Sequence, residues 1–555
     1  MTERIINPSG PADAKILIVG EYPGADELWK GIPFQGASGT ELARMFHEAG
    51  IMLSDCRLAY AYPWQPRGYP PTLTETTKPK AAKAGMTLCT NGKFHNEAVQ
   101  AGLTLLHDEI TRLKPDLIIT LGEFALWAVT GESGITNWRG SLLTHQSGTV
   151  CIPTYSPQMI LRAWEWRIFM VRDLKRARDY QANPQAYKVD YTFSIRPSFF
   201  QVMNLLEGFT NRARAGETVK LALDIETICR HISCLGIAWD SKNALCIPFT
   251  SRNSATSAIE HYWEEHEEIA IVQALKTLLT HPRVLCAGQN FAGYDNQHFA
   301  KHWGFTPNLV FDTMLAQHTL YPGLDKALDV LSSLYCHYHR YWKDELKDYN
   351  KVPEDIHTYW TYNCKDCVIT FEIWDVLENL VQKAGLVEQF QFLMKMATRN
   401  VFRAMLRGVR IDATRRAEVS GELLQAIGER EQLIHHIAGY ALNVGSPKQM
   451  VEFFYQDLGL PVIKNRKTKQ PTCNSEALGK LAEKFPLVKP LTDLIEEKRS
   501  LGVFLSTFCM MPLDTDGRMR CSYNVAGTET FRLSSSENAF GSGGNLQNVP
   551  KGEEE

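Results

Sequence analysis

The sequence predicts a multidomain α/β protein whose last part is mostly helical. Strand–loop–helix alternation runs through the first part: residues 15–20 and 116–121 are short apolar runs, each followed by a glycine-containing turn and a helical pattern. From residue 386 onward, apolar residues recur with helical spacing. A chain of 555 residues is too long for one hydrophobic core, and its length suggests roughly three or four domains.

Changes in pattern along the chain divide it into four parts. Residues 1–188 are expected to form one α/β domain, and residues 217–385 a second. Between them, residues 189–216 contain scattered Pro, Arg and Gly, which favours a linker with a short strand near 191–195. Residues 386–555 form the helical part.

The composition is ordinary for a soluble protein. No run of about 18 apolar residues occurs, so no membrane span is predicted. Residues 1–11 lack the basic start and apolar core of a secretory signal, and we expect a cytoplasmic protein. The net charge of −3 does not by itself indicate nucleic-acid binding. The 13 cysteines form no paired zinc motif, and we expect reduced thiols.

Four acidic or phenolic side chains of the second α/β part fall into two pairs. Asp224 and Glu226 are two residues apart and follow the apolar run 219–223. Because strand side chains alternate between faces, both carboxylates should point the same way. Tyr362 and Asp366 are four residues apart in a helical pattern, so they should share a helix face.

A further acid, Asp295, follows the turn-like residues 290–293. Converging carboxylates suit hard divalent cations such as Mg²⁺ or Mn²⁺, which prefer oxygen ligands. Two such ions can activate a water molecule and stabilise the leaving oxygen of a phosphodiester. One acidic pair alone would indicate ordinary surface charge, but three ordered motifs favour a two-metal nuclease site.

These motifs resemble the 3′–5′ proofreading exonuclease domain of family A DNA polymerases, which has a ribonuclease H-like fold. Residues 311–313, Phe-Asp-Thr, are similar to a segment between the family's second and third motifs. The interval 290–295 is one residue longer than the family pattern. The resemblance implies that Tyr362 orients the attacking water and that four acids hold two Mg²⁺ or Mn²⁺ ions: Asp224, Glu226, Asp295 and Asp366.

The first part resembles the uracil-DNA glycosylase superfamily, which implies an α/β/α fold. The similar stretches are "GEYPGADE", "GIPFQGASG", "KPDLIITLGEFAL", "WRGS" and "YSPQMILR". In that family the first loop positions a catalytic acid or water, and an aromatic side chain of the second stacks on the base. The resemblance assigns these roles to Glu21 and Phe34.

The glycosylase resemblance has three departures. Ser156 stands where the family has the histidine of its His-Pro motif, and Tyr60 stands where it has a base-reading asparagine. No cysteine precedes Cys56, so the iron–sulfur cluster of some members is not expected. Losing both polar groups should remove much of the transition-state stabilisation. We therefore expect a domain retained for DNA binding or assembly, with base excision as the alternative.

The last part resembles the thumb and early palm of a family A DNA polymerase. The similar stretches are "GVRID", "GSPKQ", "DGR", "TETFRLSS" and "NLQNVP". Phe531 stands where the family commonly has glycine. The resemblance places a basic loop along duplex phosphates and further polar residues near primer–template. The residues concerned are Lys464, Arg466, Lys467 and Lys469 of the loop, then Arg532, Asn545, Gln547 and Asn548.

Together, these resemblances imply the N-terminal part of a bacteriophage-type family A replicative polymerase with a proofreading exonuclease. Its expected partners are primer–template DNA and single-stranded 3′ ends. No palm aspartates or fingers helix follow residue 550, so polymerisation is not expected from this chain alone. A second polypeptide that carries palm and fingers, as in a split polymerase, is a further expected partner, and the host cytoplasm is the expected location.

Two alternatives remain open from the sequence. One is a DNA-binding or assembly subunit of a split polymerase, in which the nuclease is silent. The other is a uracil-type DNA glycosylase that is tethered to replication.

Overall fold

The computed structural model describes residues 4–66, 72–252, 256, 258–345, 356–466 and 468–549. Its contacts divide the chain into two compact units, Met1–Met394 and Lys395–Glu555. The first unit contains two main sheets, of five and six strands, with surrounding helices, and the second is mostly helical, which confirms the predicted fold class. Within the described residues, no helix combines the length and apolarity that a membrane crossing requires. All thirteen cysteines are free thiols, as expected.

The first sheet is built from buried, mainly parallel strands in the order β2-β1-β5-β7-β6. Strands β1 and β5 are buried along their whole length, so both faces need cover from helices. Helices α2 and α8 contact each other, and α8 also contacts β5 and β7. The bounds are β1 (Ile16–Gly20), β2 (Arg57–Tyr60), β5 (Leu117–Leu121), β6 (Leu143–Thr144), β7 (Val150–Thr154), α2 (Gly36–Ala49), α4 (Glu97–Leu113) and α8 (Arg167–Ala182).

The hydrophobic core around this sheet includes a side chain from a distant part of the chain. Leu334, on helix α13 (Leu328–Tyr335), is buried in the same cluster as the strands of the first sheet. Val330 and Tyr335 of that helix also pack against this cluster. Helix α13 therefore belongs to the core of the first domain although it lies inside the second α/β part of the sequence.

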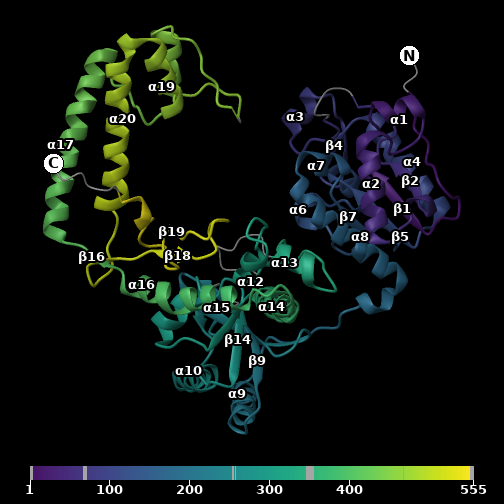
Figure 1. The fold of residues 1–555 in the computed structure, drawn as a ribbon, viewed down its shortest axis with the longest axis horizontal. Coiled ribbons are helices and arrows are strands. Elements are labelled where there is room, and N and C mark those ends of the chain that lie inside the picture. Colours follow the sequence, from purple (N-terminus) through teal and green to yellow (C-terminus); the bar gives the residue numbers. More distant parts are fainter. Residues whose placement is uncertain are drawn as a thin grey trace. The chain divides into compact units, whose positions relative to one another are not determined.

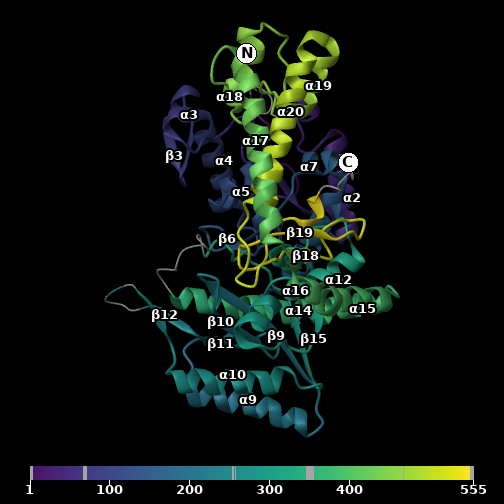
Figure 2. The ribbon, with the colours of Figure 1, turned by 90° about the vertical axis from the view of Figure 1, so that its left-hand side faces the viewer.

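The second sheet has six strands in the order β15-β14-β9-β10-β11-β8. Helices α9 and α10 contact each other on one side, and α14 contacts β9, β10 and β11 on the other; Figure 2 shows these layers. The bounds are β8 (Thr192–Ser194), β9 (Val219–Ile228), β10 (His231–Ala238), β11 (Asn243–Pro248), β14 (Val284–Gly288), β15 (Leu309–Asp312), α9 (Phe199–Arg214), α10 (Glu265–Leu279), α12 (Thr313–Leu320) and α14 (Ile356–Lys383).

The segment predicted as a linker, 189–216, is structured for most of its length. Strand β8 lies near the predicted position and pairs in parallel with β11. The rest is helix α9, whose N-cap Ser198 forms a capping box with Gln201. This helix buries an apolar stripe that includes Val202 and Leu206. The apolar stripe and the capping box are both helix signals. They outweigh the scattered Arg and Gly on which the linker prediction was based.

The second unit is organised around two long helices. Helices α17 and α20 contact each other along their length, and Figure 1 shows them side by side with α19 near one end. A small core that includes Ile434, Phe454 and Ile495 joins the pair to α18 and α19. The bounds are α17 (Ala413–Ala438), α18 (Pro447–Glu452), α19 (Ser475–Lys484), α20 (Lys489–Phe504), β16 (Val409–Arg410), β17 (Arg518–Met519), β18 (Ser522–Asn524) and β19 (Ser534–Ser536).

Candidate carboxylate site

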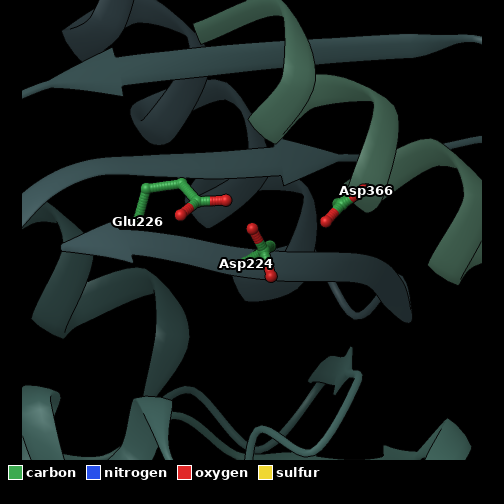
Figure 3. Close-up of side chains that lie close together, drawn as sticks. All are labelled: Asp224, Glu226 and Asp366. Atoms are coloured by element: carbon green, nitrogen blue, oxygen red, sulfur yellow. The ribbon is translucent and has the colours of Figure 1, made fainter. Parts of the chain in front are cut away.

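Strand β9 and helix α14 bring three carboxylates together. Asp224 and Glu226 come from the strand and Asp366 comes from the helix, and Figure 3 shows the three groups facing one another. One oxygen of each carboxylate lies within 4.8 Å of the other two. Asp366 is buried, whereas Asp224 and Glu226 are partly exposed. Three oxygen donors at this spacing suit a hard divalent cation that enters from solvent.

A glycine on the neighbouring strand lets α14 approach the sheet closely. Gly236 of β10 lies opposite Asp224 in the antiparallel pairing. A Cβ at this position would lie 2.5 Å from Cys367 Sγ and 2.6 Å from Asn363 Oδ1, closer than real contacts allow. The missing side chain at Gly236 therefore sets the distance between Asp224 and the helix that carries Asp366.

Asp295 lies next to the three carboxylates but is positioned by a different element and by its own hydrogen bond. It begins helix α11 (Asp295–His298) and is only 4% exposed. Its Oδ1 accepts a hydrogen bond from the backbone N–H of Ile225, at 3.1 Å, between the two strand carboxylates. The structure thus places Asp295 beside the cluster rather than among the three closest carboxylates.

The turn that leads to Asp295 is stabilised by hydrogen bonds to the buried carboxylate of Asp312, in the Phe-Asp-Thr segment identified from the sequence. Asp312 accepts hydrogen bonds from the N–H groups of Asn290 (3.1 Å) and Ala292 (3.2 Å). It also caps helix α12 by accepting from Met314 N at 3.0 Å. Burial raises the pKa of Asp312 to about 6 against the lowering effect of the backbone hydrogen bonds from Ala292, Asn290, Leu315 and Met314.

Tyr362 is buried beside the cluster and meets a lysine that the sequence did not single out. Lys343 Nζ donates to the Tyr362 hydroxyl at 2.7 Å and lies 3.4 Å from Asp366 Oδ2. The indole Nε1 of Trp342 donates to Asp366 Oδ1 at 2.7 Å. Asn363 Nδ2 donates to Asp224 Oδ2 at 2.8 Å.

Sequence reasoning missed these three neighbours for two different reasons. Asn363 directly follows Tyr362 in a predicted helix. Its place beside a predicted site residue is a local signal that could have identified it. Trp342 and Lys343 come from a segment without a helical or strand pattern. No local signal in the sequence indicated that this segment returns to the site.

The neighbouring lysine and hydrogen-bond donors only partly offset the burial of these carboxylates and the repulsion between them. Desolvation, and then the neighbouring Asp366, raise the pKa of Asp224 to about 8 against the lowering effects of Lys343 and Asn363. Burial and then Asp224 hold the pKa of Glu226 well above its usual range. Burial also raises the pKa of Asp366, against the opposing effect of Lys343. Carboxylates in this state gain most from a nearby multivalent cation.

In the first domain, the predicted base-stacking position is filled by a neighbouring ring. Phe34 lies 5.0 Å from Tyr60 between ring centroids, and its backbone N–H donates to the Tyr60 hydroxyl at 2.9 Å. The cavity lined by these residues and Gly20 holds about 10 Å³. Ligand pockets generally hold about 300 Å³ or more, so this cavity does not accept a nucleobase as it stands.

The other two predicted pocket residues make structural hydrogen bonds. Glu21 Oε1 accepts from the backbone N–H of Phe124 at 2.9 Å, near the start of helix α5 (Glu123–Thr130). Burial raises the pKa of this carboxyl group. Ser156 is the N-cap of helix α7 (Pro157–Arg162). Neither side chain therefore projects freely into an open pocket.

In the second unit, the basic loop is open to solvent. Lys464, Arg466 and Lys469 are exposed, and Arg466 forms an exposed ion pair with Glu476 at 3.4 Å. Lys467, also predicted to contact DNA, lies outside the described residues. Exposed cations of this kind are available to phosphate groups.

The remaining predicted DNA contacts lie around strand β19. Arg532 and Asn548 are exposed. Gln547 Nε2 donates to Leu533 O at 3.0 Å, and Asn545 Oδ1 accepts from Gln547 N at 3.0 Å. These hydrogen bonds hold the segment after β19 against the strand. Pro550, the last residue of the "NLQNVP" stretch, lies outside the described residues.

Comparison with family models matches three consecutive parts of the chain. Residues 8–178 match the uracil DNA glycosylase superfamily, residues 201–382 match the 3′–5′ exonuclease family, and residues 413–555 match DNA polymerase family A. Three parts of the chain are therefore similar, in this order, to uracil DNA glycosylases, 3′–5′ exonucleases and family A DNA polymerases. The three predicted resemblances are confirmed.

Curated relatives are similar over about half of the chain. DNA polymerase I of Rhizobium leguminosarum is 30% identical over 285 residues, which cover 50% of this chain and 27% of that protein. DNA polymerase I of Pseudomonas aeruginosa is 29% identical over 306 residues, 52% of this chain and 32% of that protein. The chain thus matches about a third or less of each relative's length.

One solved structure matches a larger share of the chain than these two relatives do, at a lower sequence identity. It is the POL domain of Pol1 from M. smegmatis in complex with DNA primer–template and dNTP. The identity is 20%, the TM-score is 0.45, and the match covers 65% of this chain and 56% of that one.

Proposed function

We propose that residues 217–385, together with β8 and α9, form a 3′–5′ proofreading exonuclease that hydrolyses 3′-terminal phosphodiesters of DNA. One observation carries this proposal: the carboxylates of Asp224, Glu226 and Asp366 converge within 4.8 Å. Asp295 adjoins them through Ile225. The exonuclease-family match over residues 201–382 supports the same assignment.

The same carboxylates would hold the metal ions. Asp224, Glu226, Asp366 and the adjoining Asp295 offer only oxygen donors, which fits one or two Mg²⁺ or Mn²⁺ ions. Ions of this kind, when bound, supply a nucleophilic water and stabilise the leaving oxygen. The chain's part is orientation, since Asn363 and Trp342 each donate a hydrogen bond to one of these carboxylates.

Tyr362 and Lys343 would act on the substrate side of the site. The resemblance assigns the positioning of water to Tyr362, whose hydroxyl is held by Lys343 at 2.7 Å. The ammonium of Lys343 adds a fixed positive charge beside the carboxylates. A preorganised positive charge stabilises the negative charge that develops on a phosphate during hydrolysis.

Single-stranded 3′ ends and primer–template DNA are the proposed ligands. Base stacking and backbone contacts would bind them with little sequence preference. The exposed loop cations Lys464, Arg466 and Lys469 support duplex binding. We further propose that palm and fingers act with this chain, in a longer protein or on a second polypeptide. The proposed location is the cytoplasm, that of the host if the protein is of bacteriophage type.

A primer-shortening assay tests the nuclease assignment. Wild type and Asp224→Ala are incubated with Mg²⁺ and a 5′-labelled primer–template with a frayed 3′ end. We expect wild type to shorten the primer and Asp224→Ala to leave it intact. Asp375→Ala is the matched control, because this exposed acid lies on α14 and forms an ion pair with Lys220 outside the carboxylate cluster.

Two results would contradict the assignment. Shortening by Asp224→Ala at the wild-type rate would mean that the carboxylates do not carry the chemistry. Absence of shortening by wild type would favour the DNA-binding or assembly subunit with a silent nuclease.

Base excision is not proposed for the first domain. Tyr60 fills the space beside Phe34, and the remaining cavity of about 10 Å³ is too small for a base. We expect wild type to leave uracil-containing DNA without abasic sites. Release of uracil that is lost in Glu21→Gln would overturn this expectation.

A further inference from the structure

The "WRGS" motif of the glycosylase-like domain contacts the exonuclease domain. The rings of Trp138 and Tyr341 meet edge-on with centroids 5.4 Å apart. Ser141 Oγ accepts a hydrogen bond from the backbone N–H of Tyr341 at 3.0 Å. Arg139 Nη1 donates to Ser333 Oγ at 2.6 Å. Three of the four motif residues therefore contact residues about two hundred positions further along the chain.

Two buried arginines take part in this contact. Arg139 forms a two-point ion pair with Asp173, at 2.5 and 3.0 Å, and both side chains are buried. Arg176, also buried, donates to the carbonyl oxygens of Ser333 (2.8 Å) and Cys336 (2.9 Å). A buried cation is costly unless its hydrogen bonds are satisfied. Segment 333–336 provides two of the hydrogen-bond acceptors of Arg176. If this segment moved away, Arg176 would lose both.

The same segment continues directly into the carboxylate site. Tyr341, which is held by Ser141, is followed by Trp342 and Lys343. These two side chains contact Asp366 and the Tyr362 hydroxyl. A short covalent path thus connects the first domain with the groups that orient the proposed catalytic residues.

We propose that the glycosylase-like domain serves as the positioning scaffold of the exonuclease site. Its motif residues 138–141 fix segment 333–343, which places Trp342 and Lys343 against Asp366 and Tyr362. Ser141 and Trp138 are positioning residues in this role, because they touch none of the carboxylates. The inference rests on the proposed exonuclease function and gives the first domain a task that requires no base excision.

The first test removes one hydroxyl at the contact. Ser141→Ala in the full chain should lower the exonuclease kcat by about threefold to tenfold, the usual range for one lost hydrogen bond, with KM for a single-stranded 3′ end unchanged. Ser333→Ala, on the opposite side of the contact, should act in the same direction. Thr120→Val is the matched control, because it removes a buried hydroxyl from β5 of the same domain.

A double-mutant cycle separates positioning from general destabilisation. Trp342→Phe removes the indole N–H that donates to Asp366. If Ser141 acts through this segment, Ser141→Ala should lower kcat little further in the Trp342→Phe background, because coupled residues are not additive. Effects that multiply, or a Ser141→Ala kcat equal to that of Thr120→Val, would overturn the proposal.

Hydrogen–deuterium exchange supplies a readout that does not depend on activity. Backbone amides of residues 337–345 should exchange faster in Ser141→Ala than in wild type and Thr120→Val. Unchanged exchange would contradict the scaffold role. If wild type fails to shorten a primer while the exchange result is positive, the exonuclease assignment fails and the contact itself stands.

Discussion

At the scale of single residues, one glycine controls how closely helix and strand approach at the carboxylate site. A Cβ at Gly236 would meet Cys367 Sγ at 2.5 Å. We expect Gly236→Ala to push α14 away from β10, separate Asp366 from Asp224 and lower kcat by about tenfold or more, since small misplacements are costly in catalysis. Steady-state kinetics on a single-stranded 3′ end measures the effect.

Another glycine in the same domain provides the control. Gly208 lies in helix α9, and a Cβ there would meet nothing within 4 Å. Gly208→Ala should leave kcat unchanged and stabilise the domain by about 0.5–1 kcal/mol, because alanine favours the helix. Equal kinetic effects of the two substitutions would argue against close approach as the role of Gly236.

Phe531 provides a second prediction at the residue scale. It adopts a left-handed conformation, φ +59°, at the position where the resembled family commonly has glycine. This conformation costs a residue with a Cβ about 1–2 kcal/mol. We expect Phe531→Gly to be more stable than Phe531→Ala by about 1 kcal/mol, measured by denaturant unfolding. Both variants lose the ring, so their difference isolates the backbone; a more stable alanine variant would contradict the prediction.

At the scale of elements, Asp312 joins the end of β15 to both the 290–292 turn and helix α12. Asp312→Ala would lose the helix cap and leave buried N–H groups without acceptors. We expect a loss of about 2–4 kcal/mol in unfolding free energy, with a fall in kcat as the turn that precedes Asp295 shifts.

An exposed cap in the same compact unit separates the two effects of Asp312. Asn96→Ala removes the N-cap of α4, which should cost only about 1 kcal/mol and leave kcat unchanged. Calorimetric unfolding and kinetics measure both variants. Equal destabilisation would mean that Asp312 acts as a helix cap alone.

At the scale of the whole molecule, stability should depend on pH and metal together. The pKa of Asp224 is raised to about 8, so between about pH 4 and pH 8 the folded chain holds a proton that the unfolded chain has lost. Without metal, this group's contribution to stability therefore falls as pH rises through that window. Metal binds the deprotonated carboxylates, so stabilisation by Mg²⁺ should grow through the same window.

Thermal unfolding with Mg²⁺ or with a chelator, at about pH 6 and about pH 8.5, measures this linkage. The increase in Tm caused by Mg²⁺ should be larger at the higher pH. The increase should largely disappear in Asp224→Ala. A pH-independent increase in wild type would contradict the assignment of these carboxylates as the metal ligands.

Local periodicity by itself determined several features of this protein. Strand alternation predicts that Asp224 and Glu226 share a face, and helix periodicity predicts the same for Tyr362 and Asp366. The ordered motifs also indicate the three families that the comparisons confirm. These inferences succeed because they need only the chain's immediate neighbours and the geometry of one strand or helix.

Only the tertiary structure decided which distant segments complete the site. Lys343 and Trp342 contact Tyr362 and Asp366 although no local pattern marks them. Tyr60 fills the space beside Phe34. The "WRGS" motif contacts a segment of the second α/β domain through Ser141. Such contacts depend on how side chains far apart in sequence pack together, and periodicity along a single element does not encode that packing.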